Sequence, residues 1–98
     1  MNDYNRRQIK NINEHILAYE KGITDLGGLI LGIEALLNAL DGMPEAWLDK
    51  VRNQWGILEE VYSVELMQGL PIEVPENRLL VNRAIVEIKR LLDAGLLE

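Results

Sequence analysis

Residues 26–40 read LGGLILGIEALLNAL, and this stretch decides the fold class. Its leucines and isoleucines recur at the three- and four-residue spacing of one face of an α-helix. They are Leu26, Leu29, Ile30, Ile33, Leu37 and Leu40. A second, smooth face consists of Gly28, Gly32, Ala35 and Ala39. A helix that is apolar on most sides sits centrally among others. With Glu34 inside it, the stretch is also shorter than the roughly 20 apolar residues of a membrane span, so we expect a buried helix of a globular protein.

Three further amphipathic stretches flank this helix, and cap residues mark where each begins and ends. The expected helices cover residues 3–21, 24–40, 44–68 and 76–94. Asp3 and Thr24 are the expected N-caps, and Pro44 is the expected first residue of the third helix. Glycines are the expected stops, namely Gly22, Gly69 and Gly95.

Apolar stripes on these segments predict the rest of the core. They are Ile9, Ile12, Ile16 and Tyr19 in the first helix; Trp47, Leu48, Val51, Trp55, Leu58, Val61, Tyr62 and Leu66 in the third; and Leu80, Ala84, Ile88, Leu91 and Leu92 in the fourth. The longest break is residues 70–77, LPIEVPEN, whose prolines favour extended backbone. Because short connections make consecutive helices antiparallel neighbours, we expect one all-α domain over residues 1–98. It would be a small antiparallel four-helix bundle with a longer loop between helices three and four.

The composition is typical of a single globular domain. The chain has 98 residues, of which 48% are hydrophobic and 27% are charged. It has no cysteine, which excludes disulfides and thiolate metal sites. The first fifteen residues, MNDYNRRQIKNINEH, have no apolar segment behind their charges and so do not resemble a secretory signal. We therefore expect a cytoplasmic protein with no membrane partner.

The net charge of −6 is concentrated in the middle of the chain. Residues 22–77 hold ten acids against two bases, Lys50 and Arg52, whereas the segments on either side are each close to neutral. A field of this sign repels phosphate groups and attracts basic proteins. The sequence thus predicts no nucleic-acid partner and favours a basic protein.

The residues that usually carry catalysis are sparse and isolated. His15 is the only histidine and belongs to no Glu-x-x-His or His-Glu-x-x-His pattern. Ser63 is the only serine; no base accompanies it in a recognisable motif, and it lacks the Asp-Ser-Leu context of an acyl carrier protein. We expect no catalytic residues, no cofactor and no metal site, and hence a protein that is not an enzyme.

Residues 59–77, EEVYSVELMQGLPIEVPEN, contain five acids and no Lys or Arg. Repulsion among these acids brings no structural gain, and acids around aromatic and apolar side chains are a pattern found at interfaces. We predict a partner-binding face that consists of Glu59, Glu60, Tyr62, Glu65, Glu73 and Glu76, with Glu45 and Asp49 as outer members. Acids of the second helix and its turn extend it: Asp25, Glu34 and Asp41. The alternative is a solvated acidic surface that only keeps the protein soluble.

Two segments, AYEKGITDLGGLILGIEALLNAL (18–40) and PEAWLDKVRNQWGILEEVY (44–62), carry a family resemblance. They resemble small helical immunity proteins of bacterial polymorphic toxin systems, in particular those of contact-dependent growth inhibition loci. The resembling positions are Glu20, Gly22, Thr24, Leu26, Glu34 to Leu37, Trp47, Trp55, Leu58, Glu59 and Tyr62. These are mostly core and cap positions, so no binding residue carries over. The resemblance implies a one-to-one inhibitor of a cognate toxin domain, and for an acidic member a basic nuclease, such as a ribonuclease A-like toxin.

Two other functions stay open. The first is a non-catalytic helical adaptor or regulator, whose smooth face at Gly28, Gly32, Ala35 and Ala39 would form a homodimer seam. The second is a small enzyme, which would show a ligand-dependent rise in melting temperature. We favour the monomeric immunity protein.

Overall fold

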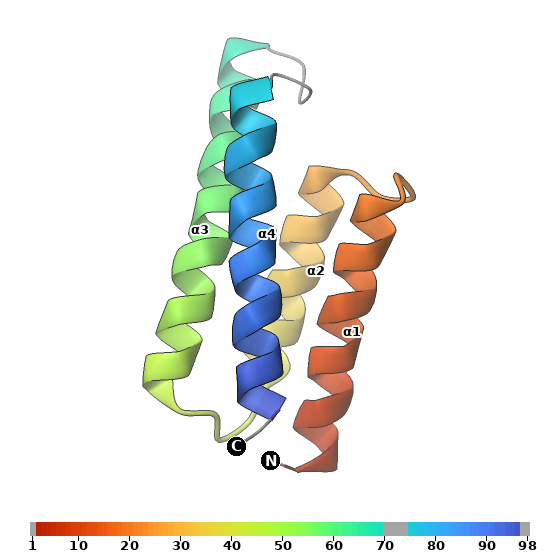
Figure 1. The fold of residues 1–98 in the computed structure, drawn as a ribbon, viewed down its shortest axis with the longest axis vertical. Helices are drawn as coiled ribbons and strands as arrows, with labels where there is room; N and C mark the ends of the chain where they lie inside the picture. Colours follow the sequence, from red (N-terminus) through yellow and green to blue (C-terminus); the bar gives the residue numbers. More distant parts are fainter. Residues whose placement is uncertain (1, 70–74, 97–98) are drawn as a thin grey trace.

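Four α-helices form an antiparallel bundle in the computed structural model, which describes residues 2–69 and 75–96 (Figure 1). The helices are α1 (Asp3–Glu20), α2 (Leu26–Ala39), α3 (Glu45–Gln68) and α4 (Pro75–Leu96). In the order of the bundle α1 packs on α2, α2 on α3, α3 on α4 and α4 back on α1. The predicted all-α four-helix bundle is confirmed. Residues 70–74 of the predicted loop lie outside the described residues, and its last three, 75–77, begin α4.

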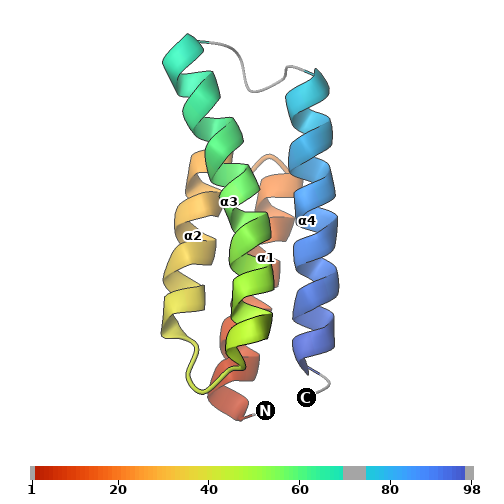
Figure 2. The same cartoon turned by 90° about the vertical axis from the view of Figure 1, so that its left-hand side faces the viewer.

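The two helical hairpins differ in length. The longer helices α3 and α4 extend beyond the connection between α1 and α2, at the end of the bundle away from the two chain termini (Figures 1 and 2). The last two turns of α3 and the first turns of α4 therefore have fewer helical neighbours than the rest of the bundle. Several apolar side chains are exposed there, namely Val64, Leu66, Met67, Leu79 and Leu80.

The core follows the predicted stripes in α1 and α2. In the longer helices, three predicted core residues of α3 are only half-buried, namely Leu48, Trp55 and Tyr62, and there are two larger differences. In α4 the buried row consists of Val81, Ala84, Ile85, Ile88, Leu91, Leu92 and Gly95. Leu80, which we expected inside, is 46% exposed. In α3 Leu66 is likewise exposed. An apolar row with helical spacing can be drawn from Leu80 or from Val81. The rotation of α4 against α3 buries the row that begins at Val81.

The N-caps of α1 and α2 each lie one residue away from the predicted N-cap. Asn2, not Asp3, is the N-cap of α1, and its Oδ1 accepts a bond from the Asn5 amide at 2.7 Å. Asp25, not Thr24, is the N-cap of α2, and its Oδ1 accepts from the Gly28 amide at 2.8 Å. Neighbouring polar residues are nearly equal caps, so the path of the incoming chain decides between them.

Pro44 occupies the N-cap of α3 rather than its first helical position. Its ψ of 133° is extended, and Glu45 is the first residue of the helix. At the other end of α3 the predicted stop is confirmed, because Gly69 adopts the left-handed φ of 64° that glycine accepts without steric cost.

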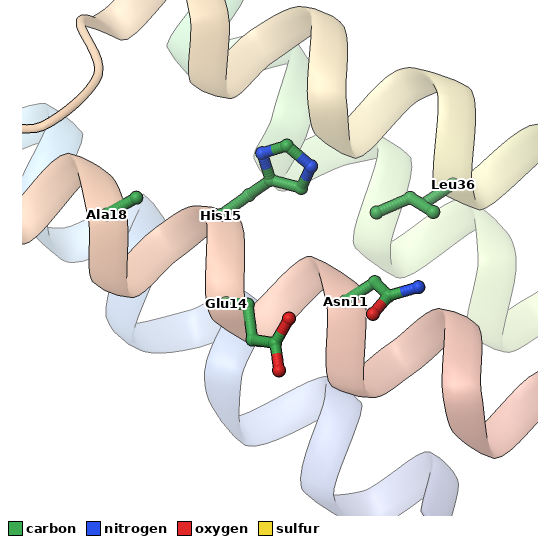
Figure 3. A pocket seen from close by; sticks show the side chains of 5 residues that line it. All are labelled: Asn11, Glu14, His15, Ala18 and Leu36. Atoms are coloured by element: carbon green, nitrogen blue, oxygen red, sulfur yellow. The ribbon is translucent and has the colours of Figure 1, made fainter.

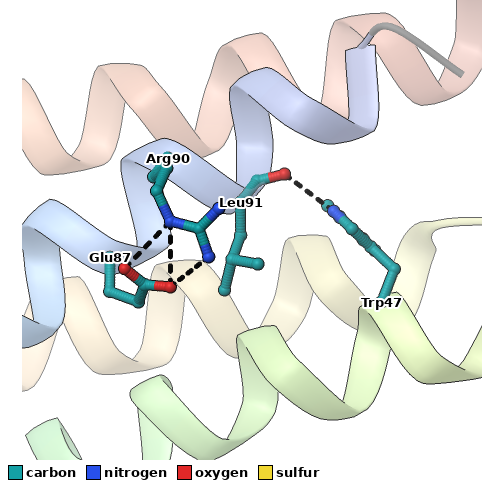
Figure 4. A network of polar contacts seen from close by, with 4 residues as sticks. All are labelled: Trp47, Glu87, Arg90 and Leu91. Atoms are coloured by element: carbon teal, nitrogen blue, oxygen red, sulfur yellow. Dashed lines mark hydrogen bonds and ion pairs between the residues drawn. The ribbon is translucent and has the colours of Figure 1, made fainter.

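Gly95 is not the stop that the sequence predicted, because α4 continues to Leu96. Gly95 is buried against the Trp47 ring, and a Cβ at this position would lie only 2.9 Å from that ring. Trp47 Nε1 donates to the Leu91 carbonyl oxygen at 2.7 Å (Figure 4). The glycine therefore provides space for a tryptophan that joins α3 to α4.

A buried asparagine holds the connection between α2 and α3. Asn5 Nδ2 donates to the Asp41 carbonyl oxygen at 2.6 Å, and the Asp41 amide donates back to Asn5 Oδ1 at 3.0 Å. Asn5 is only 3% exposed. The amide oxygen and the amide nitrogen of its side chain are thus both hydrogen-bonded to the backbone of Asp41. The sequence did not indicate this role.

Candidate protein-binding groove

A groove lies between the first half of α2 and the second half of α3. Trp55 of α3 donates from Nε1 to the Ile30 carbonyl oxygen at 2.9 Å, which joins the two helices at one end of the groove. At the start of α2, Gly27 leaves room for Tyr62, whose hydroxyl would lie 2.7 Å from a Cβ at that position. The groove encloses about 480 Å³. Its lining residues are Asp25, Gly27, Gly28, Ile30, Leu31, Glu34, Glu59, Tyr62, Ser63 and Leu66.

The charge of the groove is entirely negative. Asp25, Glu34 and Glu59 line it, and no basic side chain is among the described residues that line it. Asp25 uses one oxygen as the α2 cap. Within the described ranges 2–69 and 75–96, neither Glu34 nor Glu59 forms an ion pair. The two carboxylates are exposed and so keep their capacity to bind a cation from another molecule.

The apolar part of the groove includes two leucines with exposed side chains. Leu31 is 69% exposed and Leu66 is 64% exposed, on opposite sides of the groove. Ile30 is buried beneath them. A concave apolar surface with a few charged groups at its edge is the usual make-up of a binding site.

The structure brings part of the predicted acidic face together. Glu59 and Tyr62 lie in the groove, and Asp25 and Glu34, predicted as extensions, join them there. Glu60 points to the other side of α3, into a cleft of about 320 Å³ between α3 and α4 that Ile57, Val61, Val64, Asn77 and Leu80 also line.

The other predicted contact residues are dispersed. Glu45 and Asp49 are exposed in the first turns of α3, at the end of the bundle away from the groove. Glu76 is exposed at the start of α4, and Asp41 lies beyond the opposite end of α2. Glu73 lies outside the described residues. Among the residues that the structure describes, the predicted acids therefore do not form one continuous face.

Glu65 is inside the protein. Its side chain is 2% exposed, and neither carboxyl oxygen has a hydrogen-bond partner within the described part of the chain. It follows Leu58 and Val61 at helical spacing, so it occupies a core position of α3. Its charge suggested a surface position, whereas its spacing already indicated the core. In this conformation Glu65 is not available to a partner.

His15 lines a separate hollow on the surface between α1 and α2 (Figure 3). This hollow, of about 320 Å³, is also lined by Asn11, Glu14, Ala18 and Leu36. The imidazole lies against Gly32 of α2, where a Cβ would come within 2.8 Å of Nδ1. Gly32 of the smooth face thus contacts α1 within the same chain. Ser63 lines the α2–α3 groove instead, and the described residues that line the hollow include no hydroxyl side chain.

The described residues contain no group of three or more His, Asp or Glu placed to hold a metal ion. Among those residues, no helix combines the length and apolar character needed to cross a bilayer. Comparison with protein-family models, curated proteins and solved structures found no match to this chain.

Proposed function

We propose that this protein is an immunity protein that binds one-to-one to a cognate basic toxin domain, a nuclease and in particular a ribonuclease, and neutralises it in the cytoplasm. The observation that carries the proposal is the α2–α3 groove, which three acids and no base line. Proteins with complementary surface fields associate faster and reject partners of the wrong charge. The family resemblance of residues 18–40 and 44–62 supports a toxin domain as the basic partner.

Neutralisation by binding requires no catalytic residue on this chain. A nuclease presents cationic side chains to the phosphates of its substrate, and carboxylates can pair with the same side chains. Glu34 and Glu59 are the acids available for this pairing, and Asp25 contributes its negative charge while it caps α2. A standard interface buries about 1,600 Å² in total, so contacts beyond the groove belong to the complex.

The test uses the C-terminal domain that the neighbouring gene encodes, taken as the candidate toxin. Binding is measured by calorimetry at low and high salt, together with cleavage of RNA by the toxin. We expect one-to-one binding that weakens with salt and abolishes cleavage. The absence of binding at either salt concentration would refute the proposal for that neighbour.

A matched pair of triple variants tests the groove within this experiment. Asp25→Asn, Glu34→Gln and Glu59→Gln together remove the groove acids while asparagine keeps the α2 cap. Asp3→Asn, Glu14→Gln and Asp93→Asn remove the same charge from α1 and α4. The groove variant should associate more slowly and lose salt dependence, and the control variant should change far less. Equal effects of the two would show that only net charge matters.

The adaptor or regulator stays as the second proposal, because exposed apolar side chains at the projecting ends of α3 and α4 also suit a protein contact. Size-exclusion chromatography with light scattering separates the two. A stable homodimer of the isolated chain would favour the adaptor.

A further inference from the structure

We infer that the α2–α3 groove takes an amphipathic basic helix of the partner, in which Lys or Arg flank an apolar anchor side chain. This inference rests on the proposed function, whose partner is a basic protein, and it specifies what part of that partner is recognised. Such a ligand must offer apolar surface as well as positive charge, because the groove presents both apolar and acidic side chains.

The apolar surface is the first part of the argument. Leu31 and Leu66 expose most of their side chains on the two sides of the groove, above the buried Ile30. A purely cationic ligand would leave these leucines in water or would bring unpaired charge against them, and either is unfavourable. An apolar anchor between them would bury area on both partners, which is the main favourable contribution to association.

The acids are the second part. Glu34 and Glu59 lie beside this apolar centre with no ion pair of their own among the described residues, and Asp25 lies at the end of the groove by the start of α2. Basic side chains next to the anchor would meet these carboxylates while their aliphatic stems cover the leucines. Tyr62 offers an aromatic ring within reach of the same cations.

The helical form of the ligand follows from the shape of the site. The groove runs between two adjacent helices, α2 and α3, and its volume of about 480 Å³ is in the range of side-chain and ligand pockets. A helix laid along two helices packs its side chains into the groove as the helices of the bundle pack on one another. Recognition of an amphipathic helix through apolar anchors at helical spacing is a general mode of peptide binding.

The test uses two synthetic peptides of the same composition. One has leucines along one helical face with arginines on both sides of them, and the other has the same residues in an order that forms no apolar face. The emission of Trp55, whose indole donates to the carbonyl of the groove residue Ile30, reports binding. Calorimetry gives the affinity. We expect the amphipathic peptide to bind at least about tenfold more tightly than its permuted control.

Three variants locate the site. Leu31→Ser should weaken binding of the amphipathic peptide about tenfold, since the leucine side chain loses its burial. Glu34→Gln with Glu59→Gln should weaken it and reduce its salt dependence. Leu79→Ser, at a leucine of α4 that is exposed but does not line the groove, should leave it unchanged. All these positions are exposed, so circular dichroism should show an intact fold.

Equal affinity of the two peptides, no binding of either, or an unchanged affinity of Leu31→Ser would each overturn the inference. The toxin experiment separates this failure from that of the proposed function. If the toxin binds wild type and Leu31→Ser equally well, the immunity proposal stands and the amphipathic site is refuted. If the amphipathic peptide binds in the groove but the toxin does not bind the protein, the site stands and the choice of partner is wrong.

Discussion

Replacement of Glu65 by leucine should make this protein more stable. The side chain occupies the core row of α3 after Leu58 and Val61, and it is almost completely buried. Neither oxygen has a partner among the described residues, so the wild-type protein bears the full cost of removing this group from water. Leucine has a similar size and suits the same row, which makes Glu65→Leu a change of polarity more than of shape.

The magnitude follows from that cost. A buried polar group without a hydrogen bond destabilises by about 1–3 kcal/mol, and some of the gain is lost to imperfect packing of the branched leucine. We expect a net increase in the free energy of unfolding of about 2 kcal/mol, taken from the middle of that range. For a domain of this size it corresponds to a rise in melting temperature of about 10 °C.

The assay is thermal and urea unfolding of wild type and three variants at neutral pH. Glu60→Leu changes the same residue type at an exposed position of the same helix and should stay within about 0.5 kcal/mol of wild type. Glu65→Gln leaves an unpaired polar amide at the same buried position, so it should gain less than leucine. A melting temperature of Glu65→Leu at or below that of wild type would refute the reasoning, because the carboxylate would then have a stabilising role in the core.

Three further predictions concern other parts of the bundle. Gly56 lies in α3 at a position where an added Cβ meets no atom within 4 Å, so Gly56→Ala should stabilise the protein by about 1 kcal/mol. Gly95→Ala should not show this gain, because Trp47 must move to make room for the Cβ. Urea unfolding of the two variants tests the difference. Asn5→Ala removes both bonds to Asp41 and should cost about 2 kcal/mol in the same assay, and a cost below that of an ordinary surface change would contradict the role of Asn5. The hydrogen bond from Arg90, and to a smaller extent the charge of Arg90, lower the pKa of Glu87 (Figure 4). The pair therefore stabilises the folded state at pH values above the ordinary carboxyl pKa. This stabilisation disappears as the pH falls through the lowered pKa of Glu87. Arg90→Gln should raise the pKa of Glu87 back toward its ordinary value in an NMR titration, and an unchanged pKa would show that Arg90 is not its cause.

Local periodicity was enough to predict the four helices and most of their buried faces. The predicted stripe of α1 and the row of leucines and isoleucines on α2 are both buried in the structure. At the start of α4 two rows were possible, and only contact with α3 decides that Val81 is inside and Leu80 outside. Gly95 shows a similar limit, since a glycine near a helix end can serve as a stop or as space for a partner such as Trp47, and its sequence position does not distinguish these roles.

The groove could be predicted only in part, because it joins residues from two helices. The charge of residues 59–77 pointed to Glu59 and Tyr62, but it pointed equally to Glu60 and Glu65. Consecutive residues of a helix face different directions, so the four separate into the groove, the cleft against α4 and the core. The sequence did not indicate that Leu31 and Leu66 are exposed. Leu66 has the spacing of the core row of α3, and Leu31 lies within the apolar stretch 26–40.

The α1–α4 side and the α2–α3 side of the bundle differ in the polar contacts that join their helices. Between α1 and α4, Lys89 pairs with Glu20 at 2.9 Å, and Arg78 donates to the Tyr19 hydroxyl at 2.8 Å. Between α2 and α3, Glu34 and Glu59 lie beside two exposed leucines, and within the described ranges they pair with no base. What distinguishes the groove is that exposed leucines, and acids without an ion pair among the described residues, line the same concave surface. A ligand that brings both apolar area and positive charge accounts for the two features together.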